Sequence, residues 1–325
     1  MIFLVLCAAC CILYGGLFGF LAHISHKSIL VSAPSSSDAT LYLKRGHGLL
    51  RASYLAKEAG YVSRAWHFRL LALYLGASRS LQAGEYKAKQ GETLASLIEK
   101  MKLGKVYHRT ITIPEGLSNK QIQSLLEKNT FIEMDVSSLA EEGIYAPNTY
   151  HFPRGVQAST LLSIMRQNQE EILDTLWGNK PVDFIFSSKK EVLTLASIIE
   201  KETAIAGERT LIAGVFINRL KKKMRLQSDP TIIYGITKGL PLKRALTRKD
   251  VRTKTDYNTY RIKGLPPTPI ANPGLESIRS VFYPGAVDYL YFVADGKGGH
   301  AFAKTYEEHL VNVRVWRAYK KETQK

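Results

Sequence analysis

The first twenty-two residues carry no charged side chain, and nearly all of them are apolar. Such a run, at ~1.5 Å rise per helical residue, is long enough to cross a hydrocarbon core of ~30 Å. A cleaved signal peptide is the alternative, but its apolar region is shorter, roughly 7–15 residues, and follows a basic start. Val31-Ser32-Ala33 imitates a cleavage site, although Pro34 would directly follow the cut. We therefore expect an uncleaved transmembrane anchor at residues 1–24 and a polar linker at residues 25–39.

Beyond the linker, the hydrophobic pattern alternates between helical and strand periods. Apolar residues at helical spacing predict helices over 49–59, 63–75, 94–103, 118–127, 161–176, 189–203, 208–220 and 305–321. Alternating or β-branched runs predict strands over 86–90, 107–113 and 290–294, the last of them buried. The aromatic segment 143–155, with two Pro and two Gly, is expected to be a structured loop without regular elements.

The order of these elements indicates the fold class. Helices and strands are interleaved without a regular βαβ rhythm, and no repeat of 20–50 residues is visible. This excludes solenoids and propellers and predicts an α+β fold.

Composition adds a strong positive charge. The 325 residues include 45 Lys and Arg against 28 Asp and Glu, a formal net charge of +17. Residues 219–263 alone hold fourteen basic and three acidic side chains. Such an excess favours a polyanionic neighbour. Because no nucleic-acid motif accompanies the charge and an anchor is expected, an acidic polymer or anionic lipid fits better than nucleic acid.

Cysteine and histidine usage excludes several kinds of chemistry. All three cysteines lie in the first eleven residues, which leaves no disulfide framework, zinc finger or cysteine nucleophile in the folded part. The eight histidines are scattered, and Gly298-Gly299-His300 belongs to neither a P-loop nor a dinucleotide fingerprint. A Ser-His-Asp triad is not excluded by spacing, but no GxSxG elbow is present. We expect no metal and no cofactor.

The candidate for catalysis is the end of the helix over residues 189–203. Glu200 and Glu202 follow an apolar run, and residues two apart on a helix point ~200° apart. They therefore cannot form a close catalytic pair. Partial desolvation of one carboxyl would raise its pKa and suit a general acid. The alternative is a solvated helix end in which Lys201 accompanies both acids, and helical geometry alone does not choose between Glu200 and Glu202.

Polar and aromatic residues downstream are candidates for sugar binding. Gln227, Asp229 and Tyr234 follow a basic helix end, although Asp229 could simply cap the next element. Asn258 and Tyr260 lie in a Pro-rich segment, and loops of this composition often bind carbohydrate or nucleic acid. A rigid surface loop is the alternative.

Several long motifs resemble one family. Residues 195–236 are similar to the core of the endolytic murein transglycosylases, the YceG-like family. Four further stretches agree, in order: AGEYKAKQGETL, TYHFPRG, YNTYRIKGLPPTPIANPG and YLYFVADGKGGHAF. The resemblance covers roughly residues 80–320, and the expected anchor also fits it.

The resemblance implies an activity and a location. Family members are held by one N-terminal helix in the bacterial inner membrane, with the catalytic domain on the periplasmic side. They cleave the β-1,4 bond between MurNAc and GlcNAc in nascent glycan strands, leave 1,6-anhydro-MurNAc ends and terminate strand elongation. The implied partners are peptidoglycan glycan strands and peptidoglycan synthases, not nucleic acid. A lytic transglycosylase needs one carboxyl, because the substrate's own C6 hydroxyl is the nucleophile.

The resemblance also assigns residues and domains. It maps the catalytic acid onto Glu200 and makes Glu202 and Tyr150 substrate-binding candidates beside Gln227, Asp229, Tyr234, Asn258 and Tyr260. The AGEYKAKQGETL segment resembles a LysM module, which gives a LysM-like domain at 40–110 and a larger α+β catalytic domain at 111–325. A noncatalytic, membrane-anchored peptidoglycan-binding or divisome scaffold is the alternative function, and the intact motif around Glu200 argues against it.

Overall fold

The computed structural model of the chain describes residues 15–16, 18–20, 22–23, 40–89 and 91–323. The predicted anchor lies mostly outside these residues, and the predicted linker lies entirely outside them. No helix within the described ranges is both long and apolar enough to cross a membrane. The chain divides into two compact units. The N-terminal unit ends at Thr110 but also takes in His151–Gly155, and the C-terminal unit comprises 111–150 and the chain from Val156 onward.

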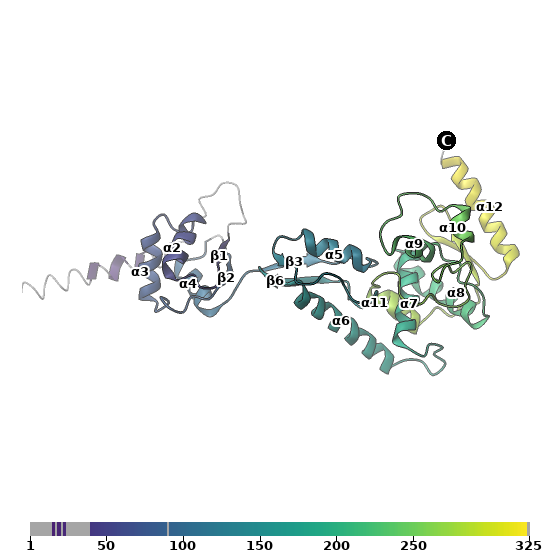
Figure 1. Cartoon of the computed structure of the whole chain (residues 1–325), viewed down its shortest axis with the longest axis horizontal. Coiled ribbons are helices and arrows are strands. Elements are labelled where there is room, and N and C mark those ends of the chain that lie inside the picture. The colour runs from purple at the N-terminus through teal and green to yellow at the C-terminus, as the bar shows by residue number, and fades with distance from the viewer. Residues whose placement is uncertain (1–14, 17, 21, 24–39, 90, 324–325) are drawn as a thin grey trace, which may run out of the picture. The chain divides into compact units, whose positions relative to one another are not determined.

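The N-terminal unit packs helices on a small antiparallel sheet (Figure 1). Its elements are β1 (Leu41–Leu43), α2 (Leu49–Glu58), α3 (Ala65–Tyr74), β2 (Gly84–Tyr86) and α4 (Leu94–Leu103). Strand β1 pairs with β2 so that Leu41 lies opposite Tyr86. The residues that fill this core are almost completely buried: Leu41, Leu43, Phe68, Leu71, Tyr86, Leu97, Ile98 and Met101.

Local signals set the ends of α4 as the sequence predicts. The Thr93 hydroxyl accepts the Ser96 backbone N–H at 3.2 Å, and Gly104 ends the helix with a φ of +66°. The strand predicted over residues 86–90 is misplaced, because β2 ends at Tyr86. Its partner β1 is three residues long and lies about forty residues earlier, so local alternation could not define the paired segment.

A buried carboxylate stabilises the N-terminal unit. Glu85 on β2 is 1% exposed and receives both Nε and Nη2 of Arg109 at 2.8 Å. Arg154, from the segment that joins this unit later in the chain, lies 3.6 Å from the same carboxylate. Burial alone would raise the pKa of Glu85, but these cations and the Thr40 hydroxyl hold it below its ordinary value.

Short strands and two helices follow along the chain. Strand β3 (His108–Thr112) pairs with β5 (Thr149–Pro153), and each of these strands contributes residues to both units. Within the C-terminal unit, β4 (Ile132–Glu133) pairs in parallel with β6 (Val156–Gln157). Helix α5 (Asn119–Lys128) starts at a capping box made by Ser118 and Gln121, as Ser118 predicts, and α6 is Ala158–Gly178.

The expectation of a loop without regular elements over residues 143–155 is wrong. Residues 149–153 form strand β5, with alternating exposed and buried side chains. Its partner β3 lies about forty residues earlier, and the Pro and Gly residues obscured the strand pattern.

Three helices form the core of the C-terminal unit. Helices α7 (Lys189–Glu202), α8 (Arg209–Lys221) and α11 (Leu275–Phe282) all contact one another. Their shared core comprises Val192, Leu195, Ala196, Ile199, Ile212, Phe216, Ile278, Val281 and Phe282. The 3₁₀ turn η1 (Ala206–Glu208) joins α7 to α8, and α9 (Asp229–Thr237) and α10 (Arg248–Arg252) follow α8.

The C-terminal unit ends with a hairpin covered by a helix. Strands β7 (Tyr291–Ala294) and β8 (His300–Ala303) are antiparallel, with Ala294 opposite His300, and α12 (Tyr306–Thr323) packs on both. Strand β7 is half-buried rather than buried as predicted, because no second sheet covers it among the described elements. The mixture of helices with four two-stranded sheets in the described part of the chain confirms the α+β class.

Candidate active site

The C-terminal end of α7 presents two carboxyls to different surroundings. Glu202 is the last residue of the helix, and Thr203 follows with extended backbone. Glu200 and Glu202 are two positions apart, so their side chains leave the helix on nearly opposite sides. As the sequence predicts, they do not form a pair: each has its own set of neighbours.

Glu202 contacts the start of α9. The Ser228 hydroxyl donates a hydrogen bond to Glu202 Oε1 at 2.5 Å. Burial, together with the nearby Asp229 carboxylate, raises the pKa of Glu202 to about 7, although this hydrogen bond, His300 and Arg219 act in the opposite direction.

The turn before α9 is held in place by Thr259. The Ser228 backbone N–H donates to Thr259 Oγ1 at 2.9 Å, and the Gln227 N–H donates to the Thr259 carbonyl at 3.2 Å. Gln227 has a φ of +55°, a left-handed conformation that is uncommon for a residue with a Cβ. Strained backbone of this kind often accompanies functional sites, and here it fixes Ser228 against Glu202.

Asp229 and Tyr260 form a second polar pair at the same turn. The Tyr260 hydroxyl donates to Asp229 Oδ1 at 2.8 Å. Burial, with the adjacent Asp229 charge, raises the pKa of Tyr260, so its hydroxyl stays protonated. Asp229 and Gln227 are both exposed and can reach a ligand. The structure thus brings together Glu202, Gln227, Asp229 and Tyr260. These residues belong to three separate motifs of the sequence.

A buried cation favours the ionised form of Glu202. Arg219 of α8 is 6% exposed and donates to the carbonyls of Leu226 and Leu290, both at 2.6 Å. Its guanidinium also lies over the ring of Tyr291, 5.4 Å from the ring centroid. A buried Arg219 could not be predicted from the sequence, because this residue stands in a run of basic residues that predicts a solvated helix end.

Glu208 and His300 complete the surroundings of Glu202. Glu208 Oε2 lies 2.7 Å from His300 Nδ1, and Glu208 Oε1 accepts the His300 backbone N–H at 2.8 Å. Burial alone would raise the pKa of Glu208, but these hydrogen bonds hold it below its ordinary value. His300 was considered in the sequence only as a phosphate or metal ligand, and its Glu208 partner lies ninety-two positions away.

Glu200 is engaged elsewhere. Its Oε2 accepts the Gly274 backbone N–H at 2.9 Å, and its Oε1 lies 3.8 Å from Arg209. Arg209 also lies 3.6 Å from Glu115, whose pKa is raised by burial and by the Glu200 charge. The Glu200 side chain is 6% exposed, whereas that of Glu115 is 47% exposed, so this polar cluster at the start of α11 is open to solvent at Glu115.

The other predicted binding residues have internal partners. The Tyr234 hydroxyl donates to Glu142 at 3.0 Å, and burial raises the pKa of Glu142. Asn258 is 1% exposed, and its amide donates to three carbonyls of the preceding turn. Tyr150 is 5% exposed and donates to the Ala146 carbonyl at 2.6 Å. These three contacts shape the scaffold and leave none of the three side chains open toward Glu202.

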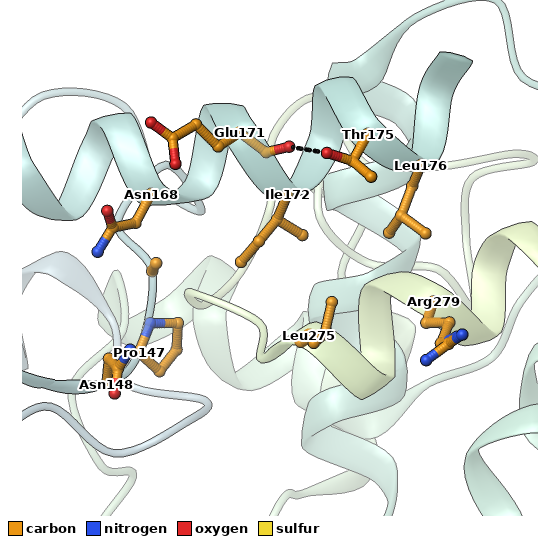
Figure 2. Close-up of a pocket in the computed structure, with 10 residues that line it drawn as sticks. Pro147, Asn148, Asn168, Glu171, Ile172, Thr175, Leu176, Leu275 and Arg279 are labelled. Atoms are coloured by element: carbon orange, nitrogen blue, oxygen red, sulfur yellow. Dashed lines mark hydrogen bonds between the residues drawn. The ribbon is translucent and has the colours of Figure 1, made fainter. Parts of the chain in front are cut away.

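Two surface pockets of the C-terminal unit lie away from both carboxyls. One, of about 520 Å³, is lined by α6, the start of α11 and the segment at Pro147 (Figure 2). The other, of about 310 Å³, is lined by Phe184, Phe282 and their neighbours. Neither lining includes Glu200 or Glu202. The candidate site therefore consists of the hydrogen-bonded groups around Glu200 and Glu202, outside both pockets.

The fold and these groups define a class of protein. Two carboxyls at the end of one helix are each held by a hydrogen bond from elsewhere in the chain, and hydroxyl, amide and carboxylate groups gather at the turn that Glu202 contacts. Such a site is suited to general acid–base catalysis on a polyhydroxylated substrate. The sequence profile of the YceG-like family matches residues 41–315, and the chain belongs to this family.

Named relatives agree with the family. The chain is 30% identical over 322 residues to an endolytic murein transglycosylase of Bacillus subtilis, covering 89% of this chain and 88% of the relative. A protein of the same name from Streptococcus pneumoniae is 28% identical over 346 residues, and the match spans 92% of this chain and 62% of that relative. A crystal structure of a yceG-like protein from Listeria monocytogenes matches with a TM-score of 0.52 and 30% identity, over 84% of this chain and 98% of that one.

Proposed function

We propose that this protein is an endolytic murein transglycosylase, which cleaves the MurNAc–GlcNAc bond of peptidoglycan and leaves 1,6-anhydro-MurNAc ends. Membership of the YceG-like family and the names of its relatives support the activity. The observation that carries the proposal is the polar cluster at the end of α7, where Glu200 accepts the Gly274 N–H at 2.9 Å and lies 3.8 Å from Arg209. Two positions on, Glu202 is joined to the turn with the exposed Asp229 and Gln227. The proposed cleavage of nascent strands would terminate their elongation.

The proposed mechanism uses one carboxyl twice. Protonated Glu200 gives its proton to the glycosidic oxygen, and the bond from that oxygen to C1 of the muramyl residue breaks. The C6 hydroxyl of the same residue then bonds to C1, and its proton goes to the Glu200 carboxylate, which restores the acid. Hydrolases need a second carboxylate at a defined distance, whereas this reaction does not, because the substrate supplies the nucleophile.

Asp229 is proposed to assist the reaction by its charge. Glycosidic cleavage passes through a transition state with positive charge near C1. The exposed Asp229 carboxylate, fixed by the Tyr260 hydroxyl at 2.8 Å, is placed to stabilise that charge. Gln227, at the same turn, is proposed to bind a sugar hydroxyl or acetamido group.

We propose Glu200 as the acid, because the resemblance maps the catalytic acid onto it. The Gly274 N–H at 2.9 Å and Arg209 at 3.8 Å hold its carboxyl at the end of α7, and they would stabilise the carboxylate that remains after it gives up its proton. Ser228 joins Glu202 to the turn that carries the exposed polar groups, and we propose that Glu202 belongs to the substrate-binding surface.

A pair of matched variants tests this assignment. We expect Glu200→Gln to lower the release of anhydro-ended glycans from purified sacculi by about 10²–10⁴-fold, because the amide can neither donate nor accept the proton. Glu202→Gln, the same substitution two residues away, should retain measurable activity at matched folding. An active Glu200→Gln beside a dead Glu202→Gln would reverse the assignment. Absence of anhydro products from the wild type would favour the noncatalytic scaffold.

We also propose that residues 1–24 anchor the chain in the bacterial inner membrane, with the C-terminal unit in the periplasm. The uncharged run at the N-terminus supports this proposal. Full-length protein should stay with the membrane fraction in alkaline carbonate, and release into the supernatant would contradict a spanning helix. Such an anchor would place the enzyme near the peptidoglycan synthases that the resemblance implies as partners.

The N-terminal unit is proposed to be a LysM-like glycan-binding module. The support is the succession of β2, the turn at Gly91 and α4, which matches the AGEYKAKQGETL resemblance. If the unit binds glycan, substitutions confined to its exposed surface should weaken binding of the inactive Glu200→Gln protein to sacculi. Unchanged binding would leave glycan recognition to the C-terminal unit.

A further inference from the structure

The larger surface pocket of the C-terminal unit, of about 520 Å³, is lined in part by the start of α11 (Figure 2). Gly274, whose backbone N–H donates to Glu200 Oε2 at 2.9 Å, directly precedes Leu275, which lines this pocket. A Cβ on Gly274 would overlap the Glu115 carboxylate, so α11 begins in close contact with the polar cluster around Glu200. The pocket contains neither carboxyl, but one of its walls begins one residue beyond the backbone group that holds Glu200.

Internal hydrogen bonds hold the walls of this pocket together. Gln169 of α6 is 1% exposed, and its side-chain amide donates to the Gly143 carbonyl at 3.1 Å and to the Pro273 carbonyl at 3.4 Å. The Ala146 N–H donates to the Met165 carbonyl of α6 at 3.0 Å. Helix α6, the loop before β5 and the start of α11 are therefore fixed relative to one another, and the pocket is pre-formed.

The lining combines apolar side chains with amides. Figure 2 shows Ile172 and Leu176 of α6 directed toward Leu275 of α11. The side-chain amides of Asn148 and Asn168 offer both hydrogen-bond donors and acceptors, as a peptide backbone requires of its partner. Among the described residues that line the pocket, none is aromatic, so no ring is available to stack on a sugar. The lining therefore suits a short peptide with small apolar side chains better than a sugar ring.

Arg279 adds a positive charge to the pocket. It is exposed, lies one turn after Leu275 on α11, and forms no ion pair within the described part of the chain. Glu171 also lines the pocket, but Gln167 donates to its Oε1 at 2.8 Å, and Figure 2 shows its carboxylate directed away from Leu275. The guanidinium is thus available to a ligand that carries a free carboxylate.

We propose that this pocket binds the short peptide that the muramyl residues of peptidoglycan carry, with Arg279 pairing with a peptide carboxylate. This inference rests on the proposed function and extends it from the glycan to the peptide. The peptide is attached to the lactyl group of a muramyl residue, the same kind of residue whose bond from C1 is cleaved. A strand bound at Glu200 therefore brings peptides to the surface beside the start of α11. Their alanine methyl groups, amide backbone and carboxylates match the apolar, amide and cationic groups of the lining.

Peptide binding gives the enzyme a means to select its strands. Contacts remote from the reacting bond strengthen substrate binding without taking part in the proton transfers. A strand that carries peptides should therefore bind more tightly than a strand from which an amidase has removed them. Arg279 acts in this scheme as a specificity-determining residue and has no role in the chemical step.

Binding of small probes to full-length protein in detergent micelles tests the pocket directly. A MurNAc tripeptide that ends in a free lysine carboxylate should bind more tightly than MurNAc alone, as measured by isothermal titration calorimetry. Changing that carboxylate to a carboxamide and the substitution Arg279→Gln should each weaken binding by about 5–10-fold, and the two changes together should cost no more than either one. Arg317→Gln, which removes an exposed arginine of α12 outside the pocket, is the matched control and should leave the affinity unchanged.

Glycan strands with and without peptides separate this inference from the proposed function. The wild type should release anhydro ends from peptide-bearing strands with a KM several-fold lower than from stripped strands. Arg279→Gln should raise the KM for peptide-bearing strands, with kcat little changed, and should leave the cleavage of stripped strands as it is. Equal KM values for both strands in the wild type, or unchanged tripeptide affinity in folded Arg279→Gln, would overturn the inference. The carboxamide probe tests the same pairing in wild-type protein if this variant does not fold. Absence of anhydro products from both kinds of strand would instead overturn the proposed function.

Discussion

Replacing Glu202 by glutamine should make the C-terminal unit more stable at pH 8. In the folded protein, burial raises the pKa of Glu202 from an ordinary 4.5 to about 7. Above pH 7 the fold must therefore hold an ionised carboxyl that an unfolded chain would solvate more favourably. Glutamine mimics the neutral acid and can still accept the hydrogen bond from Ser228.

The magnitude follows from the two pKa values. A raised folded-state pKa contributes stability that is fully present below the unfolded value and is lost as pH rises through the folded one. The interval from 4.5 to about 7 corresponds to about 3 kcal/mol, at about 1.4 kcal/mol per pH unit. Since part of the side chain remains accessible to solvent, we expect a gain of about 1–3 kcal/mol for Glu202→Gln at pH 8. At pH 4.5 the gain should vanish.

Urea unfolding at several pH values measures this difference. Trp177 and Trp316 lie in the C-terminal unit, whereas Trp66 lies in the N-terminal unit. In a Trp66→Phe background, fluorescence therefore reports on the C-terminal unit alone. A Glu202→Gln protein that is less stable than its parent at pH 8, or whose stability difference does not change between pH 4.5 and 8, would refute the inference that burial raises the pKa of Glu202.

Two further substitutions probe the surface and the core of the C-terminal unit. Replacing the exposed Lys221, Lys222 and Lys223 with glutamine should weaken binding to sacculi mainly at low ionic strength, because exposed charges are screened over ~8–10 Å in physiological salt. Co-sedimentation with sacculi measures this binding, and an equal loss of binding in high salt would mean that these lysines are structural. Gly214→Ala should lower the free energy of unfolding by about 1–3 kcal/mol, because the new Cβ would lie 2.8 Å from the Gly285 carbonyl oxygen. Gly207→Ala, which has open space around it, is the control, and equal effects on urea unfolding would contradict the packing argument.

Helices of this protein could be predicted from sequence because their signals are local. The caps at Thr93 and Ser118 and the left-handed Gly104 lie within a few residues of the positions they define. Strands β1 and β5 could not be predicted in the same way, since each is short and pairs with a segment about forty residues away. Their formation depends on contacts that no local pattern records.

The same distinction applies to the site. The sequence marked Glu200 and Glu202 because both end an apolar helix, but their environments come from elsewhere in the chain. Ser228, which contacts Glu202, lies twenty-six positions on, and Gly274, which contacts Glu200, lies seventy-four positions on. Residue type alone identified Gln227, Asp229 and Tyr260 as candidates. His300 could not be identified in this way, because its partner Glu208 lies ninety-two positions away in the chain.

The return of His151–Gly155 to the N-terminal unit has a consequence for biosynthesis. Arg154 contributes to the charge balance around buried Glu85, yet it is made more than forty residues after the last other residue of that unit, Thr110. A ribosome that has released only the first 110 residues has therefore not yet supplied one of the cations facing Glu85. The N-terminal unit reaches its final form only when the start of the C-terminal unit has also emerged, so translation couples the maturation of the two.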